Sequence, residues 1–297
     1  MKVGDIVDHS ITLNSGRVMP LLGFGTYQIP DNTSGEAIIE QALKSGYRLL
    51  DCASFYRNES AVGRAIKTTP RSDLYIVSKV WNDAIFKGSE AVRESCLKSI
   101  KDLDCQYLDL YLIHWPVPGK HVAAYHELIN LQREGFVRDI GISNYTIEDF
   151  EELLKSGIDV VPVVNQIEIN PFLNRERTIE YFRSRGILPM SFRGLRNGAG
   201  LDHPVICGVA TKHGVSPAQI LGRWLIQQGI CHIPKSSQPE RILLNADLWT
   251  FELGPTDMAE LSRLTTQESL NVFKDHYLAR IVRDTPIPLE AKNITVD

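Results

Sequence analysis

The sequence has no hydrophobic run that approaches the roughly 18 apolar residues of a membrane-spanning helix. The first ten residues, Met1 to Ser10, also lack the apolar core of a secretory signal. The formal net charge is −4, so no basic stripe is available to hold a phosphate backbone. We therefore expect a soluble, cytoplasmic chain that binds neither membranes nor nucleic acids.

Cysteine is scarce and shows no metal-binding or disulfide pattern. There are five cysteines, an odd number, and no pair has CxxC spacing. Reduced thiols that pack in the interior are therefore expected at Cys52, Cys96, Cys105, Cys207 and Cys231. The His and Asp residues lack spacings such as HExxH, so we expect no metal. No GxGxxG follows the first strand, which excludes a Rossmann fingerprint.

What the sequence does have is a regular alternation of short aliphatic runs and helical segments, a pattern typical of βαβ units. The chain of 297 residues suits a single domain, residues 1–297, folded as one (β/α)8 TIM barrel of the α/β class, a fold that typically takes about 250 residues. The predicted strands are Leu21–Gly25, Arg48–Asp51, Leu74–Lys79, Leu108–His114, Arg138–Ser143, Val163–Glu168, Ile187–Phe192 and Cys231–Pro234.

Two segments fall outside this repeat. Within residues 1–20, an N-terminal β-hairpin is predicted by two short runs, Ile11–Leu13 and Arg17–Met19, on either side of Asn14-Ser15-Gly16. This hairpin could plug the lower mouth of the barrel. Residues 265–297 form a C-terminal tail with poor periodicity, and its last part, Asp284–Leu289, contains prolines. We expect this tail to lie as an ordered loop.

Several helix ends carry recognisable signals. Thr33 and Glu36 have the spacing of a capping box at the start of the first predicted helix. Ser216 and Pro217 predict the start of a later helix, and Gly229 predicts its end.

Four polar residues stand at or just after the ends of predicted strands: Asp51, Tyr56, Lys79 and His114. In a barrel of this type the chemistry lies at the C-terminal ends of the strands, so these side chains would converge on one rim. Each also has a structural interpretation. Asp51 could cap a turn or pair with Lys79, His114 could be a hydrogen-bonded core imidazole, and Tyr56 an ordinary surface aromatic.

Taken together, the four residues predict proton donation to a carbonyl. Tyr56 could protonate a carbonyl oxygen if the neighbouring Lys79 lowers its pKa, which is ordinarily near 10. Asp51 would hold Lys79 in place, and His114 could orient the carbonyl or share its proton. No side chain supplies a hydride, so reduction would require a bound nicotinamide.

From about Ile11 to Thr266, the chain resembles the aldo-keto reductases. Its motifs occur in the family's order: Gly23-Phe24-Gly25-Thr26-Tyr27, Asp51 to Tyr56, Lys79-Val80-Trp81, His114-Trp115-Pro116, Gly141-Ile142-Ser143-Asn144, Asn165-Gln166 and Ile233-Pro234-Lys235-Ser236. The resemblance implies that Asp51, Tyr56, Lys79 and His114 form a catalytic tetrad with the tyrosine as the acid.

The resemblance also implies where NADPH is held. Residues matching Ser143, Asn144 and Gln166 bind the nicotinamide carboxamide, and an aromatic matching Phe192 stacks on the ring. Alternatively, Ser143, Asn144 and Gln166 could be polar residues that only form turns. The family's pattern places further cofactor contacts at Gly25, Thr26, Tyr27, Asp51, Arg193 and Leu195.

A second group of residues predicts which form of the cofactor is preferred, with or without the 2′-phosphate. Lys235, Ser236 and Ser237 follow the last strand, and Arg241 and Asn245 lie on the next helix, which makes a local anion site. Alternatively, these residues could form a basic surface that only contacts solvent. In the family the matching residues bind the adenosine 2′-phosphate and adenine, which implies NADPH rather than NADH.

The sequence departs from the family at two places. The family has Tyr-Ser-Pro-Leu where this chain has Phe192-Arg193-Gly194-Leu195, and Phe192 keeps the π-face that stacking needs. Arg193 could contact phosphate or point into solvent. Leu244 stands where the family often has a glutamate.

The substrate is expected to be a small-molecule aldehyde or ketone. Tyr27, Trp81 and Trp115 offer an apolar wall beside His114, although each could instead be core packing. We expect an NADP-dependent alcohol oxidoreductase, monomeric or weakly associating. One alternative is a binding or regulatory protein that keeps the cofactor but turns over weakly. Another is a dehydrogenase that runs in the oxidative direction, since the same groups serve both.

Overall fold

The computed structural model describes residues 9–289 and residue 294. Its central feature is a sheet of eight parallel strands with the order β10-β9-β8-β7-β6-β5-β4-β3. A parallel bridge between Leu22 and His232 joins the two edges, with the His232 N–H 2.8 Å from the Leu21 carbonyl oxygen. The sheet therefore closes into the predicted (β/α)8 barrel. The strands are β3 Gly23–Gly25, β4 Leu49–Asp51, β5 Tyr75–Val80, β6 Leu108–Ile113, β7 Val137–Ser143, β8 Val164–Glu168, β9 Leu188–Phe192 and β10 Cys231–His232.

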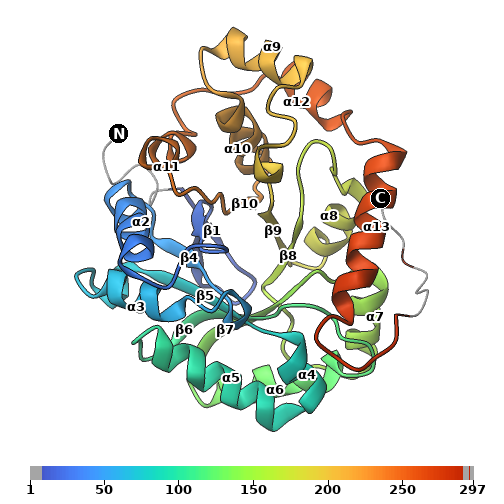
Figure 1. Ribbon diagram of the computed structural model, residues 1–297. Helices are drawn as coiled ribbons and strands as arrows, with labels where there is room; N and C mark the ends of the chain where they lie inside the picture. Colours follow the sequence, from blue (N-terminus) through green and yellow to red (C-terminus); the bar gives the residue numbers. More distant parts are fainter. Residues whose placement is uncertain (1–8, 290–293, 295–297) are drawn as a thin grey trace.

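Helices surround the sheet (Figure 1). In chain order they are α2 Thr33–Lys44, α3 Glu59–Ile66, α4 Asn82–Lys87, α5 Ser89–Asp102, α6 His121–Arg133, α7 Ile147–Lys155, α8 Glu176–Arg183, α9 Pro204–His213, α10 Pro217–Gln227, α11 Pro239–Ala246, α12 Pro255–Ser262 and α13 Gln267–Ile281. Short 3₁₀ turns occur at η1 Ser54–Tyr56, η2 Arg71–Asp73 and η3 Arg196–Gly198. Each predicted strand is present, with ends that shift by at most two residues.

The strands are buried on both faces, as the sequence of β6 illustrates. Leu110 and Leu112 belong to the cluster that fills the barrel interior. Tyr111 and Ile113, the alternate residues, belong to the larger cluster between sheet and helices. Because side chains alternate across a strand, a strand with two covered faces needs an unbroken apolar sequence.

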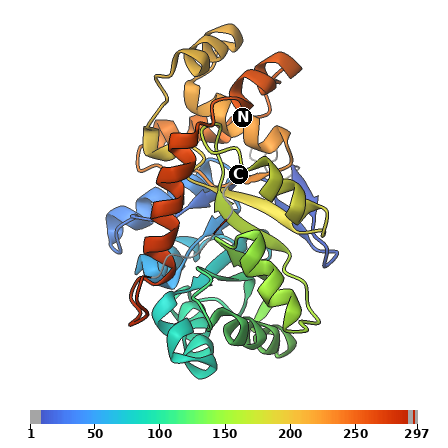
Figure 2. The same cartoon turned by 90° about the vertical axis from the view of Figure 1, so that its right-hand side faces the viewer.

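The predicted N-terminal hairpin is present. Strands β1 Ser10–Thr12 and β2 Val18–Pro20 pair antiparallel, with Ile11 opposite Met19. Leu13 and Met19 are buried with the residues that fill the barrel interior. The hairpin thus packs on one mouth of the barrel, and Figure 2 shows it on the opposite side from α13.

One helix cap differs from the sequence prediction. Asn32, not Thr33, caps α2, because the Asn32 side-chain oxygen accepts from the backbone N–H groups of Ser34 and Gly35. Thr33 is the first helical residue, so the predicted capping box with Glu36 is wrong. Asn is as good an N-cap as Thr, and here it stands one residue earlier.

The cap predicted for the later helix is correct. The Ser216 hydroxyl accepts from the Gln219 N–H, the Gln219 side chain reaches back to the Ser216 N–H, and Pro217 occupies the first helical position of α10. Gly229 follows with φ 67°, a conformation that glycine adopts without strain.

The C-terminal tail is not the loop that the sequence suggested. Its first part is the 15-residue helix α13, capped by Thr266 and Ser269. The buried residues of α13, Phe273, Tyr277 and Ile281, recur every fourth position. This single stripe is too narrow to give a clear amphipathic pattern, and packing on the barrel stabilises the helix. The tail residues 290–293 and 295–297 lie outside the described residues, as do residues 1–8 of the N-terminus.

The cysteines of the structure are free thiols; Cys52, Cys96 and Cys231 are buried, and Cys105 and Cys207 are partly buried. Within residues 9–289 and 294, no cluster of three or more His, Cys, Asp or Glu side chains could hold a metal. In that same part of the chain, none of the helices combines the length and the apolar character that a bilayer crossing requires.

Candidate active site

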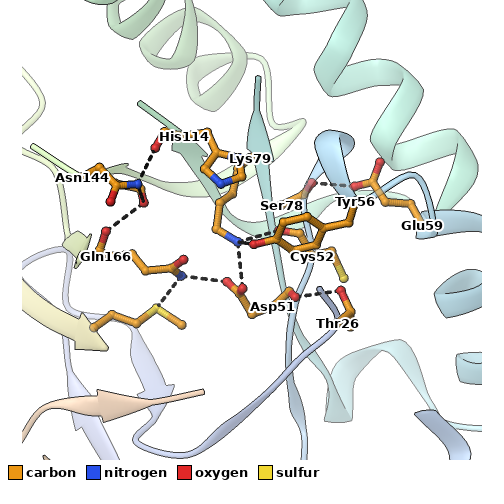
Figure 3. A network of polar contacts seen from close by, with 12 residues as sticks. Thr26, Asp51, Cys52, Tyr56, Glu59, Ser78, Lys79, His114, Asn144 and Gln166 are labelled. Carbon is orange, nitrogen blue, oxygen red and sulfur yellow. Dashed lines mark hydrogen bonds and ion pairs between the residues drawn. The ribbon is translucent and has the colours of Figure 1, made fainter. Parts of the chain in front are cut away.

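The four strand-end residues come together at one mouth of the barrel (Figure 3). Asp51 ends β4, and Tyr56 ends the η1 turn that follows it. Lys79 is the next-to-last residue of the adjacent strand β5, and His114 directly follows β6. Three neighbouring strands therefore deliver all four side chains, as predicted from their positions in the sequence.

A buried ion pair forms the centre of this group. The Lys79 Nζ lies 2.8 Å from Asp51 Oδ2 and 2.8 Å from the Cys52 carbonyl oxygen. It also donates to the Tyr56 Oη at 3.3 Å. The Lys79 side chain is fully buried, and that of Asp51 is only 3% exposed. A charged pair in such surroundings is costly unless hydrogen bonds satisfy it, and here every donor of the ammonium has an oxygen partner.

Local backbone structure explains how Tyr56 reaches the ammonium. The η1 turn is followed by Arg57 in the left-handed conformation, φ 56°, which ends the turn directly after Tyr56. The Ser54 hydroxyl donates to the Lys79 carbonyl oxygen at 3.0 Å, so the turn is tied to strand β5. The tyrosine is thereby fixed relative to the lysine through main-chain contacts.

The electrostatics of Tyr56 differ in part from the sequence prediction. Burial raises the pKa of Tyr56 to about 12, and Asp51 adds to this, while Lys79 lowers it. The expected effect of Lys79 is therefore present, but desolvation outweighs it. Burial opposes the charge of Lys79 itself, yet Asp51 and Tyr56 more than compensate and raise its pKa. At neutral pH the pair is thus a protonated phenol beside an ammonium.

His114 is held neutral. Burial lowers its pKa well below 6.5, and the charges of Lys79 and Arg280 lower it further. The Nδ1 atom is buried without a hydrogen-bond partner. The ring meets that of Tyr56 edge-on at 5.9 Å between centroids, and that of Trp81 at 4.8 Å. A neutral imidazole next to the phenol can donate one N–H but carries no charge.

The three residues expected at the nicotinamide lie in or just after the next two strands, β7 and β8, and form one hydrogen-bonded group. The Ser143 hydroxyl donates to the Gln166 carbonyl oxygen at 2.8 Å, and the Asn144 Nδ2 donates to Ser143 Oγ at 3.1 Å and to the His114 carbonyl oxygen at 2.9 Å. The Gln166 Nε2 donates to Asp51 Oδ1 at 2.8 Å. The Asn144 Oδ1 is buried and unpartnered, and thus available to a donor group.

Gly25 ends β3. Gly25 and the two residues after it lie against the segment that follows β10 and against Asp51 and Tyr56. The Gly25 N–H donates to the Pro234 carbonyl oxygen at 3.0 Å, and a Cβ at Gly25 would lie only 3.1 Å from the Ile233 carbonyl oxygen. The Thr26 hydroxyl is buried and donates to the Asp51 carbonyl oxygen at 2.9 Å. Tyr27 is 47% exposed, and its ring lies 5.1 Å from that of Tyr56.

The expected phosphate-binding residues gather where β10 leads into α11. Lys235, Ser237 and Arg241 are exposed, and Ser236 is half-buried. The Ser236 Oγ accepts from the Gln238 N–H at 3.1 Å, just before the first turn of α11. Asn245 is buried on the same helix. A hollow of about 350 Å³ lies over the start of α11.

The segment after β9 has an unusual conformation. Phe192 is half-buried at the end of the strand, and Leu195 packs against the cluster around α10. Arg193 has φ 51°, and its Nη1 lies 3.3 Å from Glu168 Oε2, so its side chain pairs with a carboxylate rather than pointing into solvent. A Cβ at Gly194 would lie 2.7 Å from Leu225 Cδ1. The glycine therefore allows the loop to lie close against α10.

Aromatic side chains form the wall beside His114. Trp81 and Trp115 are both buried, and Phe55 stacks on Trp81 at 3.9 Å between ring centroids. Trp115 meets Tyr277 of α13 edge-on at 5.9 Å. The sequence prediction missed Phe55 and the helical form of the C-terminal segment, although the tail with Phe273, His276 and Tyr277 was expected to shape the entrance to the pocket. The spacing of Phe273, Tyr277 and Ile281 was the available signal for that helix.

Comparison with known proteins agrees with this geometry. A sequence model of the Aldo/keto reductase family matches residues 21–265. The chain is 37% identical over 271 residues to the glyoxal reductase of Bacillus subtilis (strain 168), covering 91% of this chain and 97% of that protein. It is 37% identical over 273 residues to the methylglyoxal reductase DkgA of Escherichia coli (strain K12), covering 90% and 97%.

Solved structures extend the match to three dimensions. A mutant of Gox0644 in complex with NADPH superposes with a TM-score of 0.83 at 33% identity, covering 88% of this chain and 94% of that one. An aldo-keto reductase of Bombyx mori in complex with NADP gives 0.79 at 29% identity, covering 86% and 92%. Sequence and fold agree over most of each chain, and the protein belongs to the aldo/keto reductase family.

Proposed function

We propose that this protein reduces aldehydes or ketones to alcohols with NADPH, with Tyr56 as the proton donor. The observation that carries the proposal is the buried chain from Asp51 through Lys79 to the Tyr56 hydroxyl, placed beside a neutral His114 at the barrel mouth. A structural ion pair alone gives no reason for a phenol at its end. A carbonyl reductase needs that phenol, because negative charge develops on the carbonyl oxygen as reduction proceeds.

The electrostatics favour Tyr56 over His114 as the acid. With its pKa raised to about 12, Tyr56 keeps its proton at neutral pH, and an alkoxide is basic enough to take it. His114, whose pKa is depressed by burial, Lys79 and Arg280, has no extra proton to give. Its N–H orients the carbonyl oxygen instead. Lys79 stabilises the phenolate that remains after transfer, and Asp51 keeps the ammonium in place.

The residues of this chain fit a nicotinamide cofactor. The unpartnered Asn144 Oδ1 can accept from the amide of the carboxamide, and the Ser143 hydroxyl and Gln166 side chain lie in the same group. Phe192 offers a ring face at the end of β9. When bound, the nicotinamide supplies the hydride at its C4. Ser143, Asn144 and Gln166 would fix which face of the ring points at Tyr56.

The basic residues after β10 support NADPH over NADH. Lys235 and Arg241 flank the start of α11, where backbone N–H groups also favour an anion. Two structural relatives were solved with NADP or NADPH. The 2′-phosphate would lie against Lys235, Ser236, Ser237 and Arg241, with Asn245 near the adenine.

The relatives and the aromatic wall together indicate the substrate class. Two of the similar proteins are a glyoxal reductase and a methylglyoxal reductase, both named for small reactive carbonyl compounds. In this chain Tyr27, Trp81 and Trp115 present apolar surface beside the tetrad. A reactive aldehyde with a flat apolar body should therefore be a competent substrate.

The test is loss of NADPH absorbance with 4-nitrobenzaldehyde. We expect turnover by the wild type and a loss of several orders of magnitude in Tyr56→Phe, with NADPH binding retained, because one hydroxyl is removed. Tyr181→Phe, which removes a hydroxyl on the outer helix α8, is the matched control and should stay active. NADH should replace NADPH poorly. NADPH binding without turnover in the wild type would instead indicate a binding protein, and full activity of Tyr56→Phe would exclude Tyr56 as the acid.

A further inference from the structure

One side chain just after the η1 turn holds the loop that carries Tyr27. The Asn58 side chain is buried, and its Nδ2 donates to the carbonyl oxygens of Thr26 at 2.8 Å and Ile29 at 2.7 Å. The Ile29 N–H also donates to the Thr26 carbonyl oxygen at 3.0 Å, which makes residues 26–29 a β-turn, here called the rim turn. A single amide group thus bonds to both ends of the rim turn.

The rim turn depends on this support. Gln28, at its centre, has φ 60°, a left-handed conformation that is costly for a residue with a side chain. The Thr26 end is tied to β4, because its N–H and its hydroxyl both donate to the Asp51 carbonyl oxygen, at 3.1 Å and 2.9 Å. At the Ile29 end, the bond to the main chain comes from Asn58. Loss of the Asn58 amide should therefore release the end of the turn that β4 does not hold.

The rim turn in turn fixes the position of Tyr27. Tyr27 is 47% exposed, so burial alone does not hold its ring. The ring lies 5.1 Å from that of Tyr56, tilted by 55°. Because Tyr56 is the proposed acid, the position of Tyr27 determines how much aromatic surface a substrate meets next to the reacting carbonyl. Asn58 is only 1% exposed, so it would act on this surface through the turn rather than by touching the substrate.

Tyr56 has supports that do not involve the rim turn. Before it in the chain, the Ser54 hydroxyl donates to the Lys79 carbonyl oxygen at 3.0 Å. After it, Glu59 Oε1 accepts from the Ser78 hydroxyl at 2.6 Å, a contact that Figure 3 shows. Both partners belong to β5, so the segment that carries the acid is tied to this strand on both sides of Tyr56. A loosened rim turn should therefore leave the acid in place.

We propose that Asn58 is a positioning residue that sets the substrate preference of this site, favouring aldehydes with a flat aromatic body over small ones. It does so by holding the Tyr27 ring beside Tyr56 through both ends of the rim turn. The inference rests on the proposed reductase function and names a residue that determines specificity at that site. A flat aromatic body gains contact with the Tyr27 ring, whereas a small dicarbonyl such as methylglyoxal offers little surface to it.

The first experiment measures the ratio of kcat/KM for 4-nitrobenzaldehyde to kcat/KM for methylglyoxal, with NADPH. Asn58→Ala removes both hydrogen bonds, so this ratio should fall about tenfold, the scale of one or two net hydrogen bonds. Asn58→Ser keeps a hydroxyl donor, should give a smaller fall, and takes the place of the alanine variant if that variant does not fold. As the matched control, Asn14→Ala removes a side-chain amide that donates to the Pro162 carbonyl oxygen at 3.0 Å next to the N-terminal hairpin, and it should keep the wild-type ratio.

A double-mutant cycle tests whether Asn58 acts through Tyr27. Tyr27→Ala should lower the same ratio, because it removes the ring. Adding Asn58→Ala to Tyr27→Ala should then lower it no further, since there is no ring left to position. A merely structural role of Asn58 predicts instead an equal loss of kcat/KM with both aldehydes, which adds to the effect of Tyr27→Ala.

Two further measurements do not depend on turnover. Binding of 4-nitrobenzamide, a flat carbonyl compound, can be followed by the fluorescence of the tryptophans, two of which, Trp81 and Trp115, line the site. Asn58→Ala should weaken this binding in the wild-type background but not in Tyr27→Ala. In hydrogen exchange followed by mass spectrometry, peptides from the rim turn should exchange faster in Asn58→Ala, while peptides from η1 should keep the wild-type rate.

These measurements separate the possible failures. If the wild type reduces neither aldehyde but Asn58→Ala weakens 4-nitrobenzamide binding only when Tyr27 is present, the reductase function is wrong and the positioning role is supported. If the aldehydes are reduced and Asn58→Ala leaves their ratio unchanged, or its effect adds to that of Tyr27→Ala, the inference is wrong. Faster exchange in η1 as well would assign Asn58 to the segment of the acid and would also overturn it.

Discussion

Replacing Lys79 by methionine should destabilise the whole protein, because it leaves the charge of Asp51 buried without a counterion. The Lys79 Nζ contacts the Asp51 carboxylate, the Cys52 carbonyl oxygen and the Tyr56 hydroxyl. Methionine keeps an unbranched apolar stem but removes the charge. Asp51 would then remain buried, with Gln166 as the one side-chain donor left to it within the described part of the chain. Breaking a buried ion pair in this way costs about 3–5 kcal/mol of unfolding free energy.

Removing both charges should cost less than removing one. In the double variant Asp51→Asn/Lys79→Met no uncompensated charge is buried, and the amide oxygen at position 51 can still accept from the Gln166 Nε2. Neutral replacements of a buried pair are often tolerated, so we expect the double variant to be more stable than Lys79→Met alone. The coupling energy between the two positions should lie at about 1–3 kcal/mol.

Urea unfolding, followed by far-ultraviolet circular dichroism, measures all four members of this cycle. The midpoint should be lowest for Lys79→Met and partly recovered in the double variant. A cost below about 1 kcal/mol for Lys79→Met would mean that water or another group solvates Asp51, contrary to the described burial. Strictly additive effects would show that the two charges do not depend on each other.

Three further predictions follow from single contacts. Lys235→Met should raise the KM for NADPH about tenfold or more and leave that for NADH unchanged, as steady-state kinetics would reveal. Burial lowers the pKa of His232 from 6.5 to about 3, so protons bind preferentially to the unfolded chain and stability falls as the pH drops below 6.5. Between about pH 7 and about pH 5, the free energy of unfolding of His232→Leu, measured by urea titration, should fall by about 2 kcal/mol less than that of the wild type. An equal fall in both proteins would refute this prediction. Gly194→Ala should destabilise by about 1–3 kcal/mol, since its Cβ would lie 2.7 Å from Leu225 Cδ1, whereas Gly208→Ala meets no atom within 4 Å and should not lower the thermal midpoint.

The strands and the tetrad could be predicted because both depend on local rules. A strand such as β6, covered on both faces, must be apolar throughout, and Leu108–Ile113 is nearly so. Asp51, Lys79 and His114 could be identified because polar residues are out of place at the ends of such runs. The parallel sheet then brings the strand ends to one mouth, so the grouping of these residues followed from the fold.

The parts that could not be predicted depend on tertiary contacts. Helix α13 is stabilised by a narrow stripe, with Phe273 under the Arg175 guanidinium at 4.6 Å and Tyr277 donating to Asp149. Neither partner is near α13 in the sequence. The pairing of Arg193 with Glu168 depends on the register of β8 and β9, which the sequence leaves open. The raised pKa of Tyr56 likewise reflects desolvation by neighbours that the fold brings together.

The geometry of the site depends on one contact that crosses the barrel. Asp51 ends β4 and Gln166 lies in β8, strands on opposite sides of the closed sheet, and the two side chains meet at 2.8 Å. The carbonyl oxygen of Gln166 also accepts from the Ser143 hydroxyl and the Asn144 N–H. The group that holds the ammonium next to Tyr56 is therefore joined directly to the group that we propose binds the carboxamide. In the proposed mechanism this link would set the distance between proton donor and hydride donor, which a carbonyl reductase must control because both transfers act on one carbonyl.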